Sequence, residues 1–323
     1  MTSWRPGAPP ETAAERNELL AAARRFFSAR GVLEVDVPAL TTAPVSDPNV
    51  ENMRVSARIA GGHELYLGTS PEYPMKRLLA AGYPDIYSIA KVFRDDEQGR
   101  HHEPEFTLIE WYRRNFSLDA MARETCELIG SLMQRPGLAD TAQTLRYAEA
   151  FEDGLGVDPV ASSIDELRQL SDADDALARS LGSDRDAWLD LLLGLRLSPT
   201  FPAGALTVLT HYPASQAALA KLDPSDTETA LRFEVFFGSL ELANGYVELT
   251  DATAQRERFA AEAASRRASG RHYGPPDEKL LAAIAEGLPD CAGVALGFER
   301  VHMLAGGHDS IRDVISFGFG ENE

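Results

Sequence analysis

The densest group of polar side chains in this 323-residue sequence lies between two apolar stretches, at residues 94–105. The segment reads RDDEQGRHHEPE, so it holds two arginines, two adjacent histidines and several carboxylates. Arg94 and Arg100 could bind a polyphosphate, because a guanidinium donates two parallel hydrogen bonds to phosphate oxygens. Zinc binding by His101 and His102 is disfavoured, since adjacent histidines without a distant partner lack zinc-ligand spacing. A solvated hairpin tip with self-paired charges is the alternative interpretation.

A second candidate is the segment ELANGYVE, which begins at Glu241 and ends at Glu248. On an unbroken strand, residues seven apart point to opposite faces. A two-residue turn at Asn244–Gly245 would place the two carboxylates opposite each other, with Cβ atoms about 5 Å apart. A β-bulge would also bring them to one face. Such a pair suits Mg²⁺, which binds one or two carboxylates and bridges to substrate phosphates. The alternative is an exposed hairpin with two solvated glutamates.

A third candidate combines small residues with a following arginine. Gly293, Ala295 and Gly297 alternate along an apolar stretch, so a strand would present all three on one face. Missing side chains there would leave room for a flat ligand, and Arg300, at the start of the next helix, could reach it. Close packing of a helix against the strand is the commoner reason for glycine at such positions.

These segments need elements to position them, and the apolar patterns predict an α+β fold. Helices are expected from Glu11 or Thr12 to Gly31, through most of residues 118–204, and at 251–268. Strands are expected at 32–37, 85–93, 106–112, 206–209, 231–237 and 293–298. Strands therefore cluster before and after a helical middle segment, which favours a mainly antiparallel sheet flanked by helices.

Composition narrows the classes of partner. The chain has 31 Lys and Arg against 50 Asp and Glu, a formal charge of −19, which argues against a broad nucleic-acid-binding face. Cys126 and Cys291 form neither a disulfide framework nor a zinc set, which suits a reducing compartment. Neither a secretory signal nor a run of roughly 20 apolar residues is evident. We therefore expect a cytoplasmic protein with no membrane partner.

Three segments of the chain, in this order, resemble the motifs of class II aminoacyl-tRNA synthetase catalytic domains. Residues 31–38 resemble motif 1, residues 92–106 motif 2 and residues 293–300 motif 3. The strings TSPE at 69–72, PEFT at 104–107 and EWY at 110–112 resemble the lysine-type subgroup. The resemblance implies a tail at 1–10, one catalytic domain at 11–323 and a homodimer formed through motif 1.

Because only the short tail precedes the motif 1 helix in this sequence, we expect no anticodon-binding domain. Within the subgroup, the chain therefore resembles the stand-alone ligases that attach (R)-β-lysine to elongation factor P, also through the strings at 211–217 and 289–291. The resemblance implies that ATP and Mg²⁺ convert β-lysine to an adenylate. Its acyl group then passes to a lysine ε-amine of elongation factor P, with no tRNA involved.

The resemblance also implies roles for individual residues. Arg94 would hold the α-phosphate and, with Arg300, act in catalysis, while Phe106 and Arg300 would sandwich the adenine. Further ATP contacts fall on Asp95, Asp96, Arg100, His102, Glu103, Glu241, Leu242 and Gly297. The lysine pocket would be lined by Ser70, Pro71, Glu72, Tyr112, Glu248 and Ala295. Glu241 and Glu248 would bind Mg²⁺, and the methyl group of Ala295 would favour β-lysine over α-lysine.

Some residues depart from the family pattern. Asp95–Asp96 stands where the family usually has Asn-Glu, and Glu103 stands where it usually has Asn. Added negative charge there would weaken phosphate binding unless Mg²⁺ or Arg100 compensates. Three alternatives therefore stay open: a truncated lysyl-tRNA synthetase-like enzyme, a free amino-acid amide synthetase, and an inactive binding or regulatory paralogue.

Overall fold

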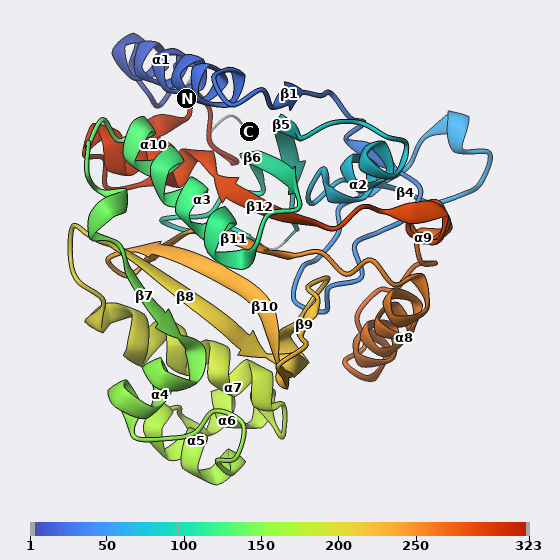
Figure 1. Cartoon of the computed structure of the whole chain (residues 1–323), viewed down its shortest axis with the longest axis vertical. Coiled ribbons are helices and arrows are strands. Elements are labelled where there is room, and N and C mark those ends of the chain that lie inside the picture. The colour runs from blue at the N-terminus through green and yellow to red at the C-terminus, as the bar shows by residue number, and fades with distance from the viewer. Residues whose placement is uncertain (1–3, 96, 321–323) are drawn as a thin grey trace.

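A nine-stranded sheet forms the centre of the computed structural model, which describes residues 4–95 and 97–320 (Figure 1). All pairings along the sheet are antiparallel except β1 with β5 and β7 with β8, at its two edges. This confirms the predicted α+β class. In spatial order the strands are β1 (Leu33–Glu34), β5 (Ile86–Phe93), β6 (Glu105–Arg114), β12 (Cys291–Gly297), β11 (Leu240–Val247), β10 (Asp226–Phe237), β8 (Leu206–Pro213) and β7 (Gln143–Arg146), with β9 (Leu222–Asp223) beside β10. A separate small sheet holds β2 (Leu40–Thr41), β4 (Leu65–Leu67) and β3 (Arg54–Val55).

Helices α1 (Pro10–Ser28), α3 (Leu118–Leu132) and α10 (Phe298–Gly306) cover one face of the large sheet (Figure 1). Their apolar side chains join those of the strands in the main core, which includes Phe27, Leu128, Trp111, Val294 and Phe298. Because side chains alternate along each strand, the residues between these core positions point to the opposite face.

The opposite face is covered at its two ends by different helices. Over β5 and β6 lie α2 (Glu72–Ala80), α8 (Ala252–Ala268) and α9 (Glu278–Gly287). Over β8 and β10 lie α4 (Tyr147–Leu155), α5 (Ile164–Ser171), α6 (Asp175–Leu181) and α7 (Arg185–Leu192). Short helical turns occupy Arg58–Ala60, Ala139–Thr141, Leu193–Leu197, Ser198–Thr200, Ala214–Gln216 and Ile311–Val314. The polar side chains of the central strands lie between the two groups of helices.

Several expected boundaries shift. Helix α1 begins at Pro10, because proline suits the first helical turn, and ends at Ser28, with Gly31 at a φ of 67°. The strand expected at 32–37 shortens to two residues because it pairs only with β5, at the sheet edge. Strand β7 was not expected within the helical middle segment, and β10 begins five residues before the expected strand at 231–237.

The turn considered at Asn244–Gly245 is wrong, because β11 continues through both residues and pairs there with β10 and β12. A Cβ at Gly245 would lie 2.6 Å from the carbonyl oxygen of Gly293 and 2.8 Å from the ring of Phe233, so close strand packing requires glycine there. A bulge is present, but at Leu242, where the register with β10 shifts by one residue. The extra residue returns Glu241 to the face that carries Tyr246 and Glu248.

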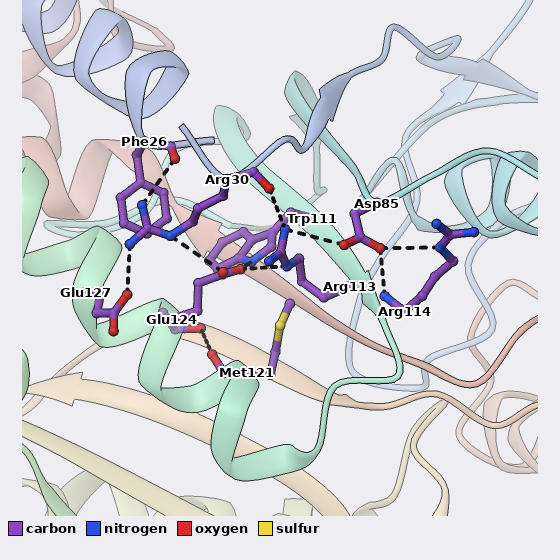
Figure 2. Close-up of polar contacts among 10 residues, drawn as sticks. Phe26, Arg30, Asp85, Trp111, Arg113, Arg114, Met121, Glu124 and Glu127 are labelled. Carbon is purple, nitrogen blue, oxygen red and sulfur yellow. Dashed lines mark hydrogen bonds and ion pairs between the residues drawn. The ribbon is translucent and has the colours of Figure 1, made fainter. Parts of the chain in front are cut away.

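Figure 2 shows a network of ion pairs that joins α1 and α3 to the core-side face of β6. We call Arg30, Asp85, Arg113, Arg114, Glu124 and Glu127 the arginine cluster. Arg30 lies over the ring of Phe26 and donates a 2.9 Å hydrogen bond to Glu127. Glu124 accepts a 3.0 Å hydrogen bond from the Trp111 indole and lies 3.4 Å from Arg113. The cluster therefore ties two helices to one strand through charges that range from buried, at Glu124, to exposed, at Arg114.

No helix in the described part of the chain has the length and apolar character needed to cross a membrane.

Candidate functional site

One helix and two strands bring a buried group of acidic and tyrosine side chains together. We call this group the acidic pocket, and it consists of Glu72 and Lys76 from α2, Glu110 and Tyr112 from β6, and Tyr246 and Glu248 from β11. All of these residues lie on the sheet face opposite the main core. Glu248 follows the last residue of β11, and Pro71 and Ser70 precede the first turn of α2.

Hydrogen bonds fix the acidic pocket in one arrangement. Glu110 accepts hydrogen bonds from Ser70 Oγ at 2.6 Å and from the Tyr112 hydroxyl at 2.7 Å. Glu72 accepts one from the Tyr246 hydroxyl and one from Lys76 Nζ, both at 2.6 Å. These carboxylates are therefore held in place before any substrate binds, which reduces the ordering needed on binding.

Glu248 is the deepest carboxylate of the acidic pocket, with 0% of its side chain exposed. Its Oε2 atom forms an ion pair with Lys76 Nζ, and Oε1 has no such partner in the described part of the chain. Neither oxygen accepts a hydrogen bond of good geometry from the described residues. A Cβ at Gly293 would overlap Oε1 of Glu248 and the ring of Tyr112, so close packing explains this glycine. An unpaired, buried carboxylate oxygen is the acceptor that an ammonium group requires.

Burial dominates the electrostatics of the acidic pocket. Removal from water raises the pKa of Glu110 to about 7 and that of Glu248 to about 8, and the charge of Glu72 adds to both shifts. Burial alone would lower the pKa of Lys76, but the charges of Glu248 and Glu72 outweigh it and raise that pKa above its ordinary value. Lys76 is therefore a cation, and the carboxylates lose their protons most readily when further positive charge arrives.

A cavity of about 600 Å³ opens beside the acidic pocket and is lined in part by Thr69, Ser70 and Glu72. This volume lies in the range typical of small-molecule sites. It therefore gives a small ligand access to the start of α2.

Arg94 lies at the end of β5, where the loop to β6 begins. Its backbone N–H donates to the carbonyl of Pro104 at 3.0 Å, and its guanidinium donates to Glu97 at 3.2 Å. The guanidinium carbon lies 5.1 Å from the ring centre of Phe106, and Nε is buried without a partner among the described residues. The long hairpin connection expected at residues 94–105 is confirmed, and it holds Arg94 by protein groups that a phosphate could replace.

Arg300 extends from α10 toward the same loop. It donates hydrogen bonds to the carbonyl oxygen of Glu241 at 2.8 Å and to Nε2 of His102 at 2.7 Å. Its guanidinium also lies 3.6 Å from the Glu241 carboxylate. Burial and the charge of Arg300 lower the pKa of His102, which favours its neutral, accepting form. The structure thus joins His102, Glu241 and Arg300, while the adenine sandwich of Phe106 and Arg300 stays a prediction.

Two other residues of this loop that were predicted to contact ATP, Arg100 and Glu103, contact protein groups instead. Glu103 is 3% exposed at its side chain, lies 3.0 Å from Arg312 Nε and accepts a 2.9 Å hydrogen bond from the backbone N–H of Phe319. Arg100 donates to the carbonyl of Asp309 at 2.7 Å. Both residues therefore fasten the loop to the segment near the carboxyl end of the chain rather than facing Arg94.

Asp95 and Asp96 are the two aspartates that depart from the family pattern. The backbone N–H of Asp95 donates to the carbonyl of Glu51 at 3.0 Å, and the Asp95 residue is exposed. Asp96 lies outside the described residues.

The expected Mg²⁺ pair of Glu241 and Glu248 is not the arrangement that the structure has. Glu248 is engaged by Lys76, whereas Glu241 lies at Arg300 and acts on Glu234 of β10. Burial, together with the charge of Glu241, raises the pKa of Glu234 to about 7. Glu234 and Glu241 share a face because of the bulge at Leu242. No group of three or more Asp, Glu, His or Cys side chains within residues 4–95 and 97–320 is arranged as a metal site.

Three predicted contacts lie on β11 and β12. The side chain of Leu242 is buried in the main core, so only its backbone faces the site, and its carbonyl oxygen lies beside Gly297. Gly297 itself is open, since a Cβ there would only reach ordinary contact with the Arg300 side chain. Ala295 pairs with Glu110 on one side and with Asn244 on the other, which puts its methyl group on the pocket face.

Sequence reasoning missed several residues that the structure brings to the site. Glu110 stands within one string that carried the family resemblance and Lys76 stands four residues after another, but neither was given a role. Glu234 follows a strand pattern, and no local signal separates it from a solvated glutamate. Asn244 was read as part of a turn, but its buried Oδ1 has no partner among the described residues. Only the register of β10 with β11 identifies Glu234 and Asn244 as neighbours.

Comparisons with known proteins agree with this geometry. The family model for class II tRNA synthetases (D, K and N) matches residues 7–320. An elongation factor P–(R)-β-lysine ligase of Edwardsiella ictaluri is 42% identical over 98% of both chains. Ligases of the same name from Sodalis glossinidius and Klebsiella pneumoniae are also 42% identical, over 98% of this chain and 97% of theirs. The chain therefore belongs to the class II tRNA synthetase family and, within it, to the elongation factor P–(R)-β-lysine ligases.

Proposed function

We propose that this ligase uses ATP to activate (R)-β-lysine as an acyl-adenylate and transfers the acyl group to a lysine ε-amine of elongation factor P. The observation that carries the proposal is the acidic pocket, in which two buried carboxylates and one half-buried carboxylate face one internal ammonium. Three ionised carboxylates and one ammonium leave two negative charges without a counter-charge, and β-lysine has two amino groups. The names of the relatives, which join elongation factor P to (R)-β-lysine, support the same substrates.

In the first step, a carboxylate oxygen of β-lysine attacks the α-phosphorus of ATP, and pyrophosphate leaves. Arg94 would bind the α-phosphate in place of Glu97 and stabilise the charge that develops there. Arg300 would stack on the adenine opposite Phe106, exchanging its contacts with His102 and Glu241. Glu72, Glu248 and Tyr112 would orient the amines of β-lysine, with Ser70 and Pro71 fixing the start of α2.

The remaining predicted ATP contacts divide between side chains and backbone. Asp95, Asp96 and His102 belong to the loop that would close on the nucleotide, and the backbone of Leu242 and the open surface at Gly297 would border it. Arg100 and Glu103 would act indirectly, since their present contacts hold this loop against residues 309–319.

We assign Mg²⁺ to Glu234 and Glu241, since two carboxylates on one face repel each other and magnesium takes one or two of them. Glu234 lies 2.6 Å from Arg232 and would exchange part of that ion pair for the metal. Bound there, the ion would supply positive charge to the phosphates of ATP. Glu248 would then serve the amine of β-lysine and not the ion.

In the second step, the ε-amine of the acceptor lysine attacks the acyl carbonyl, an amide bond forms and AMP leaves. The −19 formal charge supports a protein acceptor over tRNA, because tRNA binding needs a basic surface. We further propose that residues 11–323 act as one catalytic domain, as a cytoplasmic homodimer formed through the segment at 31–38.

The proposal is tested by ATP–pyrophosphate exchange with β-lysine, α-lysine and other amino acids, followed by mass spectrometry of elongation factor P. We expect exchange with β-lysine and a mass gain of one β-lysyl group on one lysine. Charging of tRNA with lysine would favour a synthetase instead, and a free amide product an amide synthetase. Absence of exchange with every amino acid would indicate an inactive paralogue.

A further inference from the structure

Lys76 is the single cation in contact with the carboxylates of the acidic pocket among the residues that the structure describes. It is 2% exposed at its side chain and reaches Glu72 of its own helix, one turn away, and Glu248 of β11. Its ammonium also lies 5.4 Å from the ring centre of Tyr246. The group therefore links the two elements that carry the carboxylates.

We infer that Lys76 is a positioning residue for the diamino-acid substrate: its ammonium holds Glu72 and Glu248 in place and leaves the pocket with room for two further positive charges. This inference rests on the proposed function. Lys76 itself takes no part in bond formation. Its effect passes through Glu248, whose Oε2 it contacts and whose Oε1 is left unpaired.

The charges around Lys76 explain why one internal cation is needed. From α2 comes Glu72, from β6 Glu110 and Tyr112, from β11 Tyr246 and Glu248, and from the start of β12 Cys291. Three carboxylates so close together and largely removed from water would, without a cation, repel one another and take up protons. A fully paired set, in contrast, would have no affinity for an ammonium. One lysine against three carboxylates lies between these limits.

The inference predicts a specific kinetic signature for Lys76→Met. Loss of the ammonium favours protonated carboxylates, so fewer negative charges meet the substrate at neutral pH. In pyrophosphate exchange we expect the KM for β-lysine at pH 7 to rise at least tenfold, with a smaller change in kcat. The fall of KM with rising pH should move to higher pH than in the wild-type enzyme.

Two further variants make the experiment decisive. Lys76→Arg keeps the charge, and we expect a KM within about tenfold of wild type at pH 7, with the pH dependence little changed. Lys91→Met, which removes an exposed lysine paired with Glu105, is the matched control and should leave both quantities unchanged. Circular dichroism and thermal unfolding establish that each variant is folded.

Each outcome decides the inference. A folded Lys76→Met with wild-type KM at every pH would overturn it, and so would a lower melting temperature with no shift of the pH profile, which indicates a purely structural role. If Lys76→Met does not fold, Lys76→Arg decides: a retained KM supports the inference, and a folded variant that loses binding contradicts it. Failure of the wild-type enzyme to exchange with any diamino acid would contradict the proposed function as well.

Discussion

Strand β6 separates two groups of buried or partly buried charges, one on each of its faces. On the core side and at the end of the strand, the arginine cluster opposes three guanidiniums to three carboxylates (Figure 2). On the other side, the acidic pocket opposes one ammonium to three carboxylates. Adjacent residues of the same strand belong to each: Trp111 and Arg113 face the first, and Glu110 and Tyr112 the second.

A structural charge cluster is thereby distinguished from a binding site. In the arginine cluster every charge has an opposite charge nearby, so nothing further is needed for stability. Burial raises the pKa of Glu124 in the arginine cluster too, although Arg113 and Arg30 oppose that shift. In the acidic pocket burial raises the pKa of Glu110 to about 7 and that of Glu248 to about 8, and one oxygen of Glu248 is unpaired among the described residues. Such uncompensated, desolvated groups weaken the fold unless a ligand offsets them, and they therefore mark functional sites.

Glu248→Gln should have the largest effect on activity. The change removes the charge that we expect to meet a substrate ammonium, so kcat/KM for β-lysine in pyrophosphate exchange should fall about 10²–10³-fold. The free energy of unfolding, measured by urea denaturation, should change by less than about 1 kcal/mol, because Lys76 keeps Glu72 as a partner. A large loss of stability with unchanged kcat/KM would mean that the pocket resembles the arginine cluster.

Glu124→Gln is the opposite test, on the other face of β6. Removing this charge deprives Arg30 and Arg113 of an ion-pair partner. We therefore expect the free energy of unfolding to fall by about 2–3 kcal/mol. The KM for β-lysine should stay within about twofold of wild type, corresponding to less than half a kcal/mol. Glu127→Gln, which alters a more exposed ion pair, is the control and should lower the free energy of unfolding by less than about 1 kcal/mol. Loss of substrate binding in Glu124→Gln would join the two regions functionally.

The pH dependence should distinguish the two regions in the wild-type enzyme. Because the pKa of Glu110 is raised to about 7 and that of Glu248 to about 8, the empty pocket carries protons that a dication must displace. The KM for β-lysine should therefore fall about tenfold as pH rises from 6 to 9, with protons released on binding in calorimetry.

The same raised pKa values have the opposite consequence for stability. The folded, ligand-free protein binds more protons here than the unfolded chain, so this contribution to stability falls as pH rises from the ordinary carboxyl pKa through 7 and 8. The ligand-free protein should thus lose more stability between pH 6 and 9 than Glu248→Gln does. Equal pH slopes in thermal unfolding would contradict this interpretation.

Ala295→Gly should have the smallest effect, on substrate preference alone. Its methyl group lies on the pocket face of β12, beside Glu110, and one methyl group alters discrimination by about 1–3 kcal/mol. We expect the ratio of kcat/KM for β-lysine over α-lysine to fall about fivefold, near the low end of that range. Ala292→Gly, on the core face of the same strand, should leave the ratio unchanged. An unaltered ratio in Ala295→Gly would show that Ala295 does not contribute to substrate specificity.

The sequence predicted the segments of the site better than their pairings. Arg94 and Arg300 could be singled out because arginine at these motif positions has a recognisable local pattern. The partner of Glu248 could not, because Lys76 is 172 positions away and meets it only through the packing of α2 on β11. Glu103 was expected at the nucleotide, but its partners, Arg312 and Phe319, come from a segment more than 200 residues later.

By itself, the sequence determined the mainly antiparallel α+β fold, the three motif segments and the family, because periodicity and short motifs are local properties of a chain. Only the tertiary structure decided that Glu241 acts on Glu234 while Glu248 meets Lys76. The reason is physical. A one-residue bulge at Leu242 reverses the face of every residue beyond it, and the position of a bulge depends on the neighbouring strand.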